Sequence, residues 1–586
     1  MTQHRAWQLA SQQLVAKILS ELHFEERLAF EPRSPAVCEG HAVASKLTNW
    51  RLVTASRHWD FQASQSIWGM FIITPDSIQC SDGLAPSASQ LLIDIQSQIQ
   101  INDINLAGLL EEIQQTLYSD MLRITQLRNL ASDALVTMDE TSRQRYLDAH
   151  PKAIANKGRL GWGAAELALY SPESGRAFQL HYLALNKQHC EVGFAEGLSP
   201  QRLLEEVLGS EAYLALINKL PAKNRDQFLI MAVHPWQMSR FLVGQFAEWF
   251  ANGDAIDLGP VTGDWLAQQS IRTLSAVDPR VRYDVKTALT ILNTSCYRGI
   301  PGKFIVQGPK LSAWLAQLTI QDPLFAQLGL RVQQEVAGVF CPQPYQQQVA
   351  GGSYRYQEML GCIWRERAES VLSEQQRPMS MATLMQTDSQ GKAAIVTLIE
   401  LSGLSAEAWL RKLFKHVVVP LYHLMCRYGV ALVAHGQNIT LALQGHQPVG
   451  CLIKDFHGDL RLIDQDFPEL NRLPQAIRQN LTRLPAHYLI HDLLTGHFVT
   501  VLRFVSPKLI SLGIDETQFY RYLADEIRSY QAAHPQLQER FEMFDLLKPE
   551  IEKLCVNRVR FKIGYGDSEQ RPLPEIGQPI TNPLCV

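Results

Sequence analysis

The sequence lacks the patterns that mark several large classes of protein. None of its ten cysteines forms a CxxC pair, which excludes zinc ribbons and thioredoxin-like redox sites. No run of about 18 consecutive apolar residues is present, so we expect no membrane-spanning helix. The 54 basic and 58 acidic residues give a net charge of −4, and this excludes the overall basic field on which nucleic-acid binding depends.

The signatures of common catalytic machinery are missing as well. The chain has no G-x-S-x-G, no H-E-x-x-H and no G-x-G-x-x-G, so serine-hydrolase and zinc-protease interpretations find no support and the kinase glycine loop is missing. The amino-terminal segment has no apolar signal-peptide core. Scattered cysteines are typical of free thiols in a reducing compartment. The sequence therefore predicts a cytoplasmic protein with no nucleic-acid and no membrane partner.

The sequence does contain separate helical and strand-rich regions. At 586 residues it exceeds one compact core, so two to four lobes are expected. Gly429 suits the C-cap of one predicted helix. Helical patterns lie at 5–24, 104–131, 406–429 and 487–505, and strand patterns at 40–80, 178–186, 228–237, 283–302 and 430–463. This mixture favours an α+β fold over a doubly wound sheet.

Two apolar strand patterns end in polar groups that suit a nucleotide and its cation. Residues 430–434 lead into a His-Gly-Gln-Asn segment at 435–438, and a second strand pattern ends at Asp455. Amide and carboxylate oxygens are the ligands that Mg²⁺ prefers, so Asn438 and Asp455 are the predicted metal ligands. Kinases use a similar Asn and Asp, although no Asp lies between His435 and Asn438 to act as a base. A polar β-turn with a solvated histidine is the alternative.

A second cluster carries three cations among hydroxyl groups. Alternate residues from Lys286 to Thr294 share one face of an extended strand, which would span roughly 26 Å. We predict that this strand lines an elongated site for a nucleotide and an acidic substrate, because arginine binds phosphate and carboxylate bidentately. A solvated strand with surface charges is the alternative. The cluster consists of Ser270, Arg272, Lys286, Thr294, Ser295 and Arg298.

Two further segments carry candidate histidines. The segment 150–163, HPKAIANKGRLGWG, alternates glycines with cations, which lets a backbone approach an anion closely. His150 and Lys157 are therefore candidate nucleotide ligands, with an ordinary glycine-rich hairpin as the alternative. The His-Pro-Trp-Gln segment at 234–237 ends a strand pattern and has a purely structural strand end as its alternative.

Seven segments, taken together in their order along the chain, resemble those of the IucA/IucC family. Its members are siderophore synthetases that work independently of non-ribosomal peptide synthetases. The resemblance covers residues 6–585 and is greatest to the branch that contains aerobactin synthetase and the macrocycle-forming hydroxamate synthetases of the alcaligin, putrebactin and bisucaberin type. The segments that carry it are HPKAIANKGRLGWG, AVHPWQ, WLAQQSIRTL, KTALTILNTSCYRGIPG, SYRYQEMLG, VVVPLYHLMCRYGVALVAHGQN and KDFHGDLRL.

The resemblance implies a fold, a reaction and cofactors. The fold is a hand-like, multi-lobed α+β structure, with a thumb at 1–140, fingers at 141–355 and a palm at 356–586, and the family is commonly dimeric. ATP and Mg²⁺ are the implied cofactors, and small hydroxamate precursors are the implied substrates. A carboxylate is adenylated, pyrophosphate leaves, and the acyl group passes to an amine.

The residue patterns and the resemblance together define the candidate site. The catalytic candidates are Lys286, Arg298 and His435. The nucleotide-binding candidates are His150, Lys157, Ser270, Arg272, Lys286, Thr294, Arg298, His435, Gln437 and Asp455. The substrate-binding candidates are Arg272, Thr294, Ser295, Arg298 and His435, and the metal ligands are Asn438 and Asp455.

One position departs from the family pattern, and one role stays open. Many relatives have an acid two positions before the histidine, where this chain has Val433; Asp459 and Asp464 are candidates to replace it. Lys286 can stabilise the negative charge that develops on the α-phosphate. His435 either neutralises charge at the reacting centre or removes a proton from the amine.

The substrates are the remaining question. We favour a succinyl-hydroxydiamine that is joined and closed into a macrocyclic dihydroxamate such as putrebactin, from the overall look of the C-terminal tail. The alternative within the family is an aerobactin synthase that joins a citrate monoamide to N-acetyl-N-hydroxylysine. Outside it, the alternatives are a small-molecule kinase and a non-catalytic nucleotide-binding scaffold.

Overall fold

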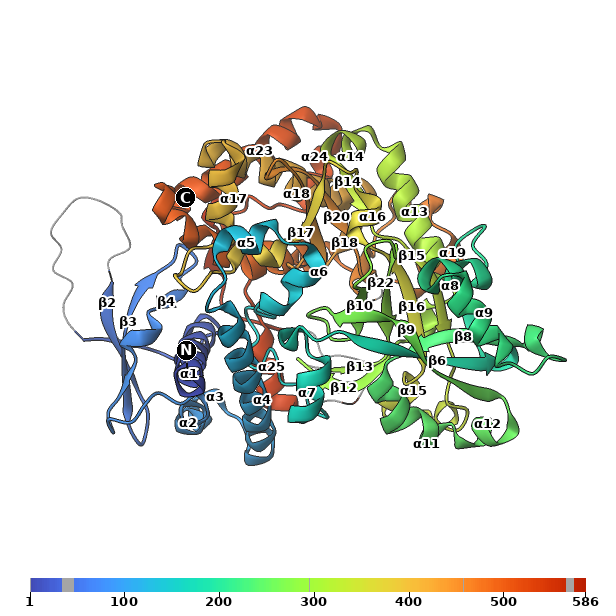
Figure 1. The fold of residues 1–586 in the computed structure, drawn as a ribbon. Helices are drawn as coiled ribbons and strands as arrows, with labels where there is room; N and C mark the ends of the chain where they lie inside the picture. Colours follow the sequence, from blue (N-terminus) through green and yellow to red (C-terminus); the bar gives the residue numbers. More distant parts are fainter. Residues whose placement is uncertain are drawn as a thin grey trace.

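The structure is arranged in three groups of elements, which appear as the blue, green and orange-to-red regions of Figure 1. It is a computed structural model, and it describes residues 2–33, 47–294, 296–456, 458–564, 567 and 574–585. The first group contains the two predicted helices, α1 (Gln3–Phe24) and α4 (Asp103–Leu127), which pack against each other. An antiparallel sheet beside them contains β2 (Thr48–Val53), β3 (His58–Gln65) and β4 (Phe71–Ile73).

The second group is built on an eight-stranded sheet in which neighbouring strands are antiparallel, in the order β7-β15-β16-β11-β10-β9-β6-β8. Helices α8 (Pro200–Leu208) and α9 (Ser210–Asn218) bury leucines in the core of this sheet. Its strands are β6 (Phe178–Asn186), β7 (Glu191–Phe194), β8 (Phe228–Val233), β9 (Ala255–Ala267), β10 (Thr273–Ala276), β11 (Tyr283–Thr287), β15 (Glu335–Phe340) and β16 (Gly361–Glu366). An antiparallel sheet with separate helices confirms the α+β class.

The segment 283–302 does not form the single long strand that its alternation predicts. β11 ends at Thr287, and the chain then enters a separate hairpin of β12 (Leu289–Asn293) and β13 (Cys296–Arg298). The Thr287 N–H donates to the carbonyl of Arg272 at 2.9 Å, and the next N–H donates to the carbonyl of Gly361 at 3.0 Å. The prediction of one elongated strand is wrong, because these long-range partners decide where β11 ends.

The third group surrounds the interior helix α18 (Ala406–Tyr428). Gly429 ends it with a φ of 63°, a left-handed C-cap that confirms the predicted role of this glycine. α18 packs against α23 (Glu516–Ala533) and β20 (Gln447–Ile453). β20 belongs to a sheet of order β14-β20-β19-β17, with β14 (Leu330–Val332), β17 (Arg377–Ser380) and β19 (Ile439–Gln444), whereas β18 (Val430–Leu432) pairs with β21 (Leu460–Ile463) in another sheet.

The helical pattern at 487–505 is an irregular helix rather than one α-helix. It passes through α20 (Ala486–Leu489), α21 (His491–Leu493), a π-helical stretch (Leu494–Leu502) and α22 (Arg503–Val505). Ala486–Leu512 is the one stretch of the described chain long and apolar enough to cross a membrane, and 72% of its most apolar window is buried. Its side chains share the hydrophobic core of α18, so it packs as a core element.

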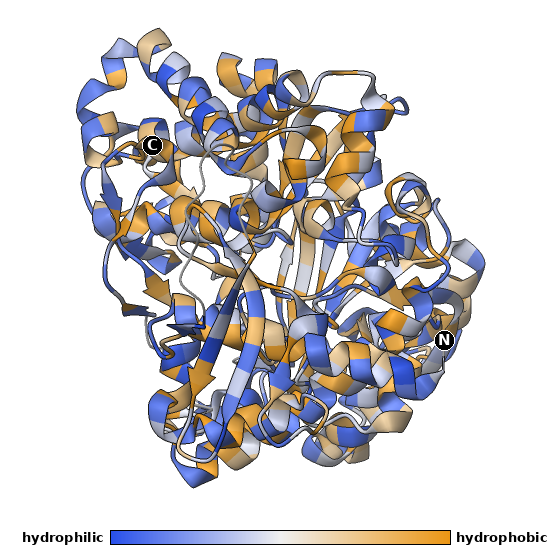
Figure 2. Ribbon diagram, turned by 90° about the vertical axis from the view of Figure 1, so that its left-hand side faces the viewer, coloured by the Kyte–Doolittle hydropathy of each residue, from blue (hydrophilic) through white to orange (hydrophobic). Residues whose placement is uncertain are grey.

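Each group has a hydrophobic core of its own, and Figure 2 shows apolar and polar residues alternating around the helices. Helices α13 (Gly308–Gln321) and α14 (Pro323–Leu328) bury side chains in the core of the third group, although the predicted fingers lobe extends to residue 355. Helix α25 (Val556–Ile563) returns to the first group. The lobe boundaries at 140 and 355 stay predictions.

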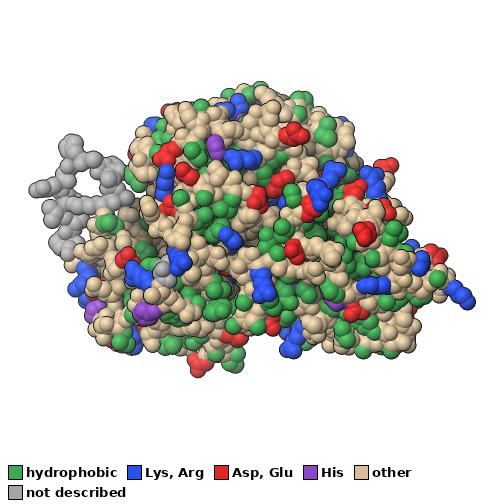
Figure 3. Space-filling model, in the orientation of Figure 1, with side chains coloured by type: hydrophobic (Ala, Val, Ile, Leu, Met, Phe, Trp, Pro, Cys, Tyr) green, Lys and Arg blue, Asp and Glu red, His purple; other side chains and the backbone are tan. Residues whose placement is uncertain are grey.

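Charged side chains of both signs are interspersed over the face of the molecule that Figure 3 shows. This distribution agrees with the small net charge of −4. That no nucleic acid binds to the chain stays a prediction.

Candidate active site

Six of the twelve predicted site residues line one cavity of about 180 Å³. The β12–β13 hairpin, the 435–438 turn and the 144–151 segment contribute to its walls. The predicted residues that line it are His150, Ser270, Thr294, Arg298, His435 and Gln437. The fold thus brings together segments that lie almost 300 residues apart in the chain.

The 435–438 turn joins β18 to β19, which belong to different sheets, and presents His435 to the cavity. The Nδ1 atom of His435 accepts hydrogen bonds from the backbone N–H groups of Gln437 and Asn438, each at 3.3 Å. Gly436 lies against the backbone of Ala382, whose nitrogen would be 2.9 Å from an added Cβ. Glycine is therefore required there, and the turn is held in one conformation.

The acceptor role of Nδ1 decides how His435 is protonated. Burial lowers the pKa of its imidazole, so the ring is neutral near pH 7. A neutral imidazole whose Nδ1 accepts carries its proton on Nε2. His435 is therefore arranged to donate a hydrogen bond from Nε2. His150 has the same arrangement, because its Nδ1 accepts from Ala153 at 3.3 Å and burial lowers its pKa to about 3.

Arg298, which lines the cavity, and its neighbour Arg272 form no ion pair with a carboxylate among the described residues. Arg272 donates to the carbonyl of Gly299, and Arg298 donates to the carbonyl of Asn293 at 2.8 Å. Burial lowers the pKa of Arg272, and the positive charge of Arg298 lowers it further. Asp455 and Glu358 offset this repulsion only in part, and a bound anion stabilises two neighbouring cations that form no ion pair.

Three non-glycine residues beside these groups have left-handed backbone conformations. The φ angle is 59° at Ile271, 65° at Thr294 and 62° at Asp455. This region is unfavourable for β-branched side chains, and each such residue costs about 1–3 kcal/mol. Strain of this kind is concentrated at functional sites, and here it coincides with the two arginines and with the acid that follows β20.

Asp455 lies in a buried network of charges. Its Oδ1 atom accepts from Lys286 Nζ at 2.6 Å and is 3.1 Å from a guanidinium nitrogen of Arg365. Arg365 also pairs with Asp284 at 3.1 Å. Burial acts to raise the pKa of Asp455, but Lys286 and Arg365 outweigh it and hold that pKa well below its usual range. The carboxylate is therefore ionised near neutral pH.

Asn438 and Asp455 fit a cation that takes most of its ligands from outside the protein. Asn438 Nδ2 donates to Val433 O at 3.0 Å and to Asp459 Oδ2 at 3.1 Å, which turns its amide oxygen away from both. The contacts of Asp455 use Oδ1 and leave Oδ2 for another ligand. Mg²⁺ typically takes one or two carboxylates together with phosphates and water. The described residues contain no cluster of three or more His, Cys, Asp or Glu side chains suited to a metal.

Lys157 is not available to a nucleotide. Its side chain is fully buried, and Nζ donates to Asp120 at 2.7 Å and to Asp148 at 2.5 Å. Arg159 of the same segment likewise pairs internally with Glu173 at 2.6 Å. The interpretation of Lys157 as a ligand is therefore corrected, because its charge is used to hold the 150–163 segment in place. Ser295 is a further predicted site residue, and it lies outside the residues that the structure describes.

The site also contains groups that the sequence patterns did not indicate. Gln268 and Asn293 line the cavity, and Arg365 supports Asp455. Arg365 had one signal in the sequence, a cation within the apolar strand pattern that became β16. Gln268 and Asn293 had none, because the direction of a side chain in a turn depends on the elements around it.

Known proteins match this chain along its whole length. Two family sequence profiles match it: the IucA / IucC family over residues 140–386, and a family described as Ferric iron reductase FhuF-like transporter over residues 407–568. The chain is 39% identical to the aerobactin synthase of Escherichia coli, over 100% of this chain and 98% of that protein. It is 30% identical to the putrebactin synthase of Shewanella sp. (strain MR-4), over 99% and 92% respectively.

A solved structure matches the fold over the same length. The aerobactin synthetase IucC from a hypervirulent pathotype of Klebsiella pneumoniae superposes with a TM-score of 0.87 at 37% identity. The match covers 100% of this chain and 99% of that chain. It therefore includes all three groups of elements, and it confirms the fold that the resemblance implied.

Proposed function

The chain belongs to the IucA/IucC family of siderophore synthetases, and from this we propose that it is an ATP-dependent ligase that joins a carboxylate to an amine. The observation that carries the proposal is the neighbouring pair of guanidinium groups, Arg272 and Arg298, which form no ion pair among the described residues, with Arg298 and His435 lining one cavity. Nucleotide phosphates and a substrate carboxylate are the anions that such a site accepts.

The reaction has two steps. A carboxylate oxygen attacks the α-phosphorus of ATP, the bond to pyrophosphate breaks, and an acyl-adenylate forms. The amine nitrogen then attacks the acyl carbon, so that the C–N bond forms while the C–O bond to AMP breaks and the nitrogen loses a proton. Negative charge increases first around the α-phosphate and then on the acyl oxygen, and fixed positive groups stabilise it.

The residues of the site divide between these tasks. Lys286 and Arg298 supply positive charge at the α-phosphate, and Arg272 and Thr294, with Ser295, orient the carboxylate. His150, Ser270 and Gln437 contact the nucleotide. Asn438 and Asp455 would hold a Mg²⁺ ion, which neutralises phosphate charge when it is bound.

For the substrates we propose a citrate monoamide as the acyl donor and N-acetyl-N-hydroxylysine as the amine. The support is that identity to an aerobactin synthase is 39%, whereas identity to a putrebactin synthase is 30%, at similar coverage. The succinyl-hydroxydiamine and macrocycle that we favoured from the C-terminal tail have less support. A homodimer and a cytoplasmic location are further proposals, and light scattering that gives twice the chain mass would support the dimer.

Product analysis tests the proposed ligase function. With ATP, Mg²⁺ and this pair of substrates, the purified protein is expected to release AMP and pyrophosphate in amounts equal to the amide product. Mass spectrometry of reactions with citrate monoamides and with succinyl-hydroxydiamines identifies the substrate class. ADP as the product would establish the kinase alternative, and ATP binding without substrate-dependent pyrophosphate release would establish the scaffold alternative.

The role of His435 leads to a second prediction. We expect His435→Gln to form amide at least about tenfold faster than His435→Ala, which corresponds to one hydrogen bond to a charged group. Glutamine keeps an N–H donor but has no basic nitrogen, so it can replace the Nε2 donor and cannot replace a base. The measurement is kcat for pyrophosphate release at saturating substrates. Equal inactivity of both variants would show that His435 acts as the base.

A further inference from the structure

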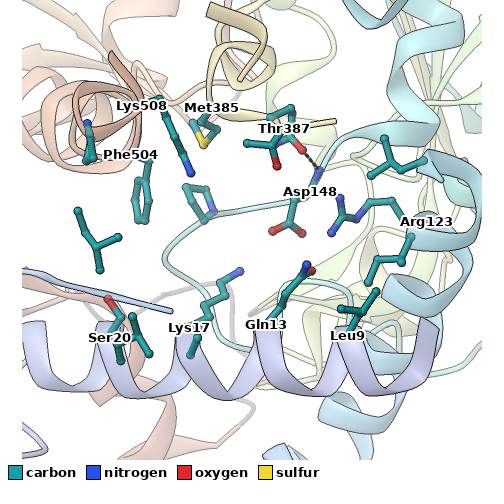
Figure 4. Close-up of a pocket in the computed structure, with 18 of the residues that line it drawn as sticks. Leu9, Gln13, Lys17, Ser20, Arg123, Asp148, Met385, Thr387, Phe504 and Lys508 are labelled. Atoms are coloured by element: carbon teal, nitrogen blue, oxygen red, sulfur yellow. Dashed lines mark hydrogen bonds between the residues drawn. The ribbon is translucent and has the colours of Figure 1, made fainter. Parts of the chain in front are cut away.

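A second cavity, of about 480 Å³, lies between the first and third groups of elements (Figure 4). Helix α1 provides Leu9 and Lys17 on one side, and α4 provides Ile124. The opposite side contains the 385–389 segment and the segment that follows the irregular helix, with Lys508. The proposed adenylation step does not use this cavity.

Lys17 and Lys508 extend into the cavity from opposite sides (Figure 4). Lys17 Nζ donates to the backbone carbonyl of His150 at 3.0 Å. Neither lysine forms an ion pair within the described part of the chain; burial lowers the pKa of Lys17, and the nearby charge of Asp148 acts against this shift. The side chain of Lys17 is half-buried and that of Lys508 is exposed, and an anion that binds between the two ammonium groups gains a charge-assisted hydrogen bond from each.

The acidic groups around the cavity are already engaged with other partners. Glu21 pairs with Arg503 at 2.8 Å, and Asp148 pairs with Lys157 at 2.5 Å. Asp388 accepts hydrogen bonds from two backbone N–H groups of its own loop, at 2.9 and 3.0 Å. The positive charge of Lys508 is therefore left for a ligand, whereas Lys17 lies near Asp148 and is compensated in part.

The second cavity borders the first. Asp148, Ala149, Pro151 and Met385 line both of them, so a ligand in the second cavity ends next to the proposed adenylate. The hydrogen bonds that Asp148 accepts from Asn156 and Lys157 both use Oδ1. Its Oδ2 atom forms no hydrogen bond among the described residues, and the charges of Lys17 and Arg123 also act on this carboxylate.

We propose that the second cavity binds the amine substrate and that this amine carries a carboxylate, which Lys17 and Lys508 bind. The assignment rests on the ligase function proposed above. Apolar side chains such as Leu9 and Phe504 contact a methylene chain, and Asp148 directs the amine toward the adenylate. An acylated N-hydroxy amino acid has this combination of groups, whereas a simple diamine has no carboxylate for the lysines.

Lys508→Ala tests the site with two amines that differ only in the carboxylate, N-acetyl-N-hydroxylysine and N-acetyl-N-hydroxycadaverine. The KM for the first is expected to rise about tenfold or more, as for loss of one charge-assisted hydrogen bond. The KM for the second is expected to change less than about twofold, and ATP–pyrophosphate exchange with the acyl donor alone is expected to be unchanged. Lys508→Arg keeps the charge and should restore binding. Lys392→Ala, which removes a lysine that pairs with Glu400 at 2.6 Å outside the cavity, is the matched control.

The outcomes separate this inference from the ligase function. An equal rise in KM for both amines, or no rise for the carboxylate-bearing one, overturns the inference. If Lys508→Ala instead raises the KM for N-hydroxy-N-succinylputrescine, the site is supported. The carboxylate that it binds is then the one on the N-acyl group of the amine substrate. If the wild-type protein shows no ATP–pyrophosphate exchange, the ligase function fails. Calorimetry with N-acetyl-N-hydroxylysine then decides the site: weaker binding to Lys508→Ala than to wild type supports it, and equal or no binding overturns it.

Discussion

We expect Arg298→Ala to lower the rate of acyl-adenylate formation by about 10²- to 10³-fold, the effect of removing one group that stabilises transition-state charge. The fold is expected to survive, because among the described residues Arg298 donates to the backbone carbonyl of Asn293 and forms no ion pair with a carboxylate. Its removal also relieves the repulsion that lowers the pKa of Arg272. ATP–pyrophosphate exchange measures the rate, and thermal unfolding measures the stability.

Two matched variants make this result specific. Arg298→Lys keeps the charge but loses the planar fork, so its rate is expected to fall between those of the wild type and the alanine variant. Arg280→Ala removes an exposed arginine that pairs with Asp278 at 2.7 Å in the turn before β11, and it is expected to have the wild-type rate. An unchanged rate in Arg298→Ala would remove this residue from the site. A large loss of stability would show that its role is structural.

The sequence indicated the site where the chemistry is local. The 435–438 turn, Asp455 and the arginines at 272 and 298 could be recognised because strand patterns end next to groups that bind phosphate and cations. Prediction from the sequence failed where the interaction partner of a residue is distant in the chain. Lys157 has the sequence context of a phosphate ligand, but its partner Asp120 lies on α4, 37 residues away in the chain. The strand break after Thr287 likewise depends on backbone partners in other segments.

The second cavity shows the same limit more strongly. Its two lysines are almost 500 residues apart, one on α1 and one after the irregular helix. Each alone has the pattern of an ordinary surface lysine on an amphipathic segment, and only the packing of the first group against the third brings them together. The end of α18 could be predicted from the sequence, unlike the pairing of these two lysines. The periodicity of a helix and its capping residue Gly429 act within a few turns of the chain.

Asp455→Asn is expected to have two separable effects, because the carboxylate is a proposed Mg²⁺ ligand and also the partner of Lys286 and Arg365. Loss of the negative charge leaves buried cations uncompensated, which is expected to lower the free energy of unfolding by about 3–5 kcal/mol. Loss of a ligand is expected to raise the Mg²⁺ concentration for half-maximal adenylation by about tenfold or more. Denaturant unfolding measures the first effect, and a Mg²⁺ titration of the exchange rate measures the second.

Asp284→Asn separates the two effects, since Asp284 also pairs with Arg365, at 3.1 Å, but is not a proposed Mg²⁺ ligand. This variant is expected to lose stability with an unchanged Mg²⁺ requirement.

The stability effect of Asp455→Asn also depends on pH, because Lys286 and Arg365 outweigh burial and depress the pKa of Asp455 in the folded state. The ionised carboxylate stabilises the wild type above its unfolded pKa of about 4, and this stabilisation is lost as the pH falls toward the folded pKa. The difference between wild type and Asp455→Asn is therefore expected to shrink in acid. An unchanged Mg²⁺ titration would leave Asp455 as a member of the ion-pair network alone.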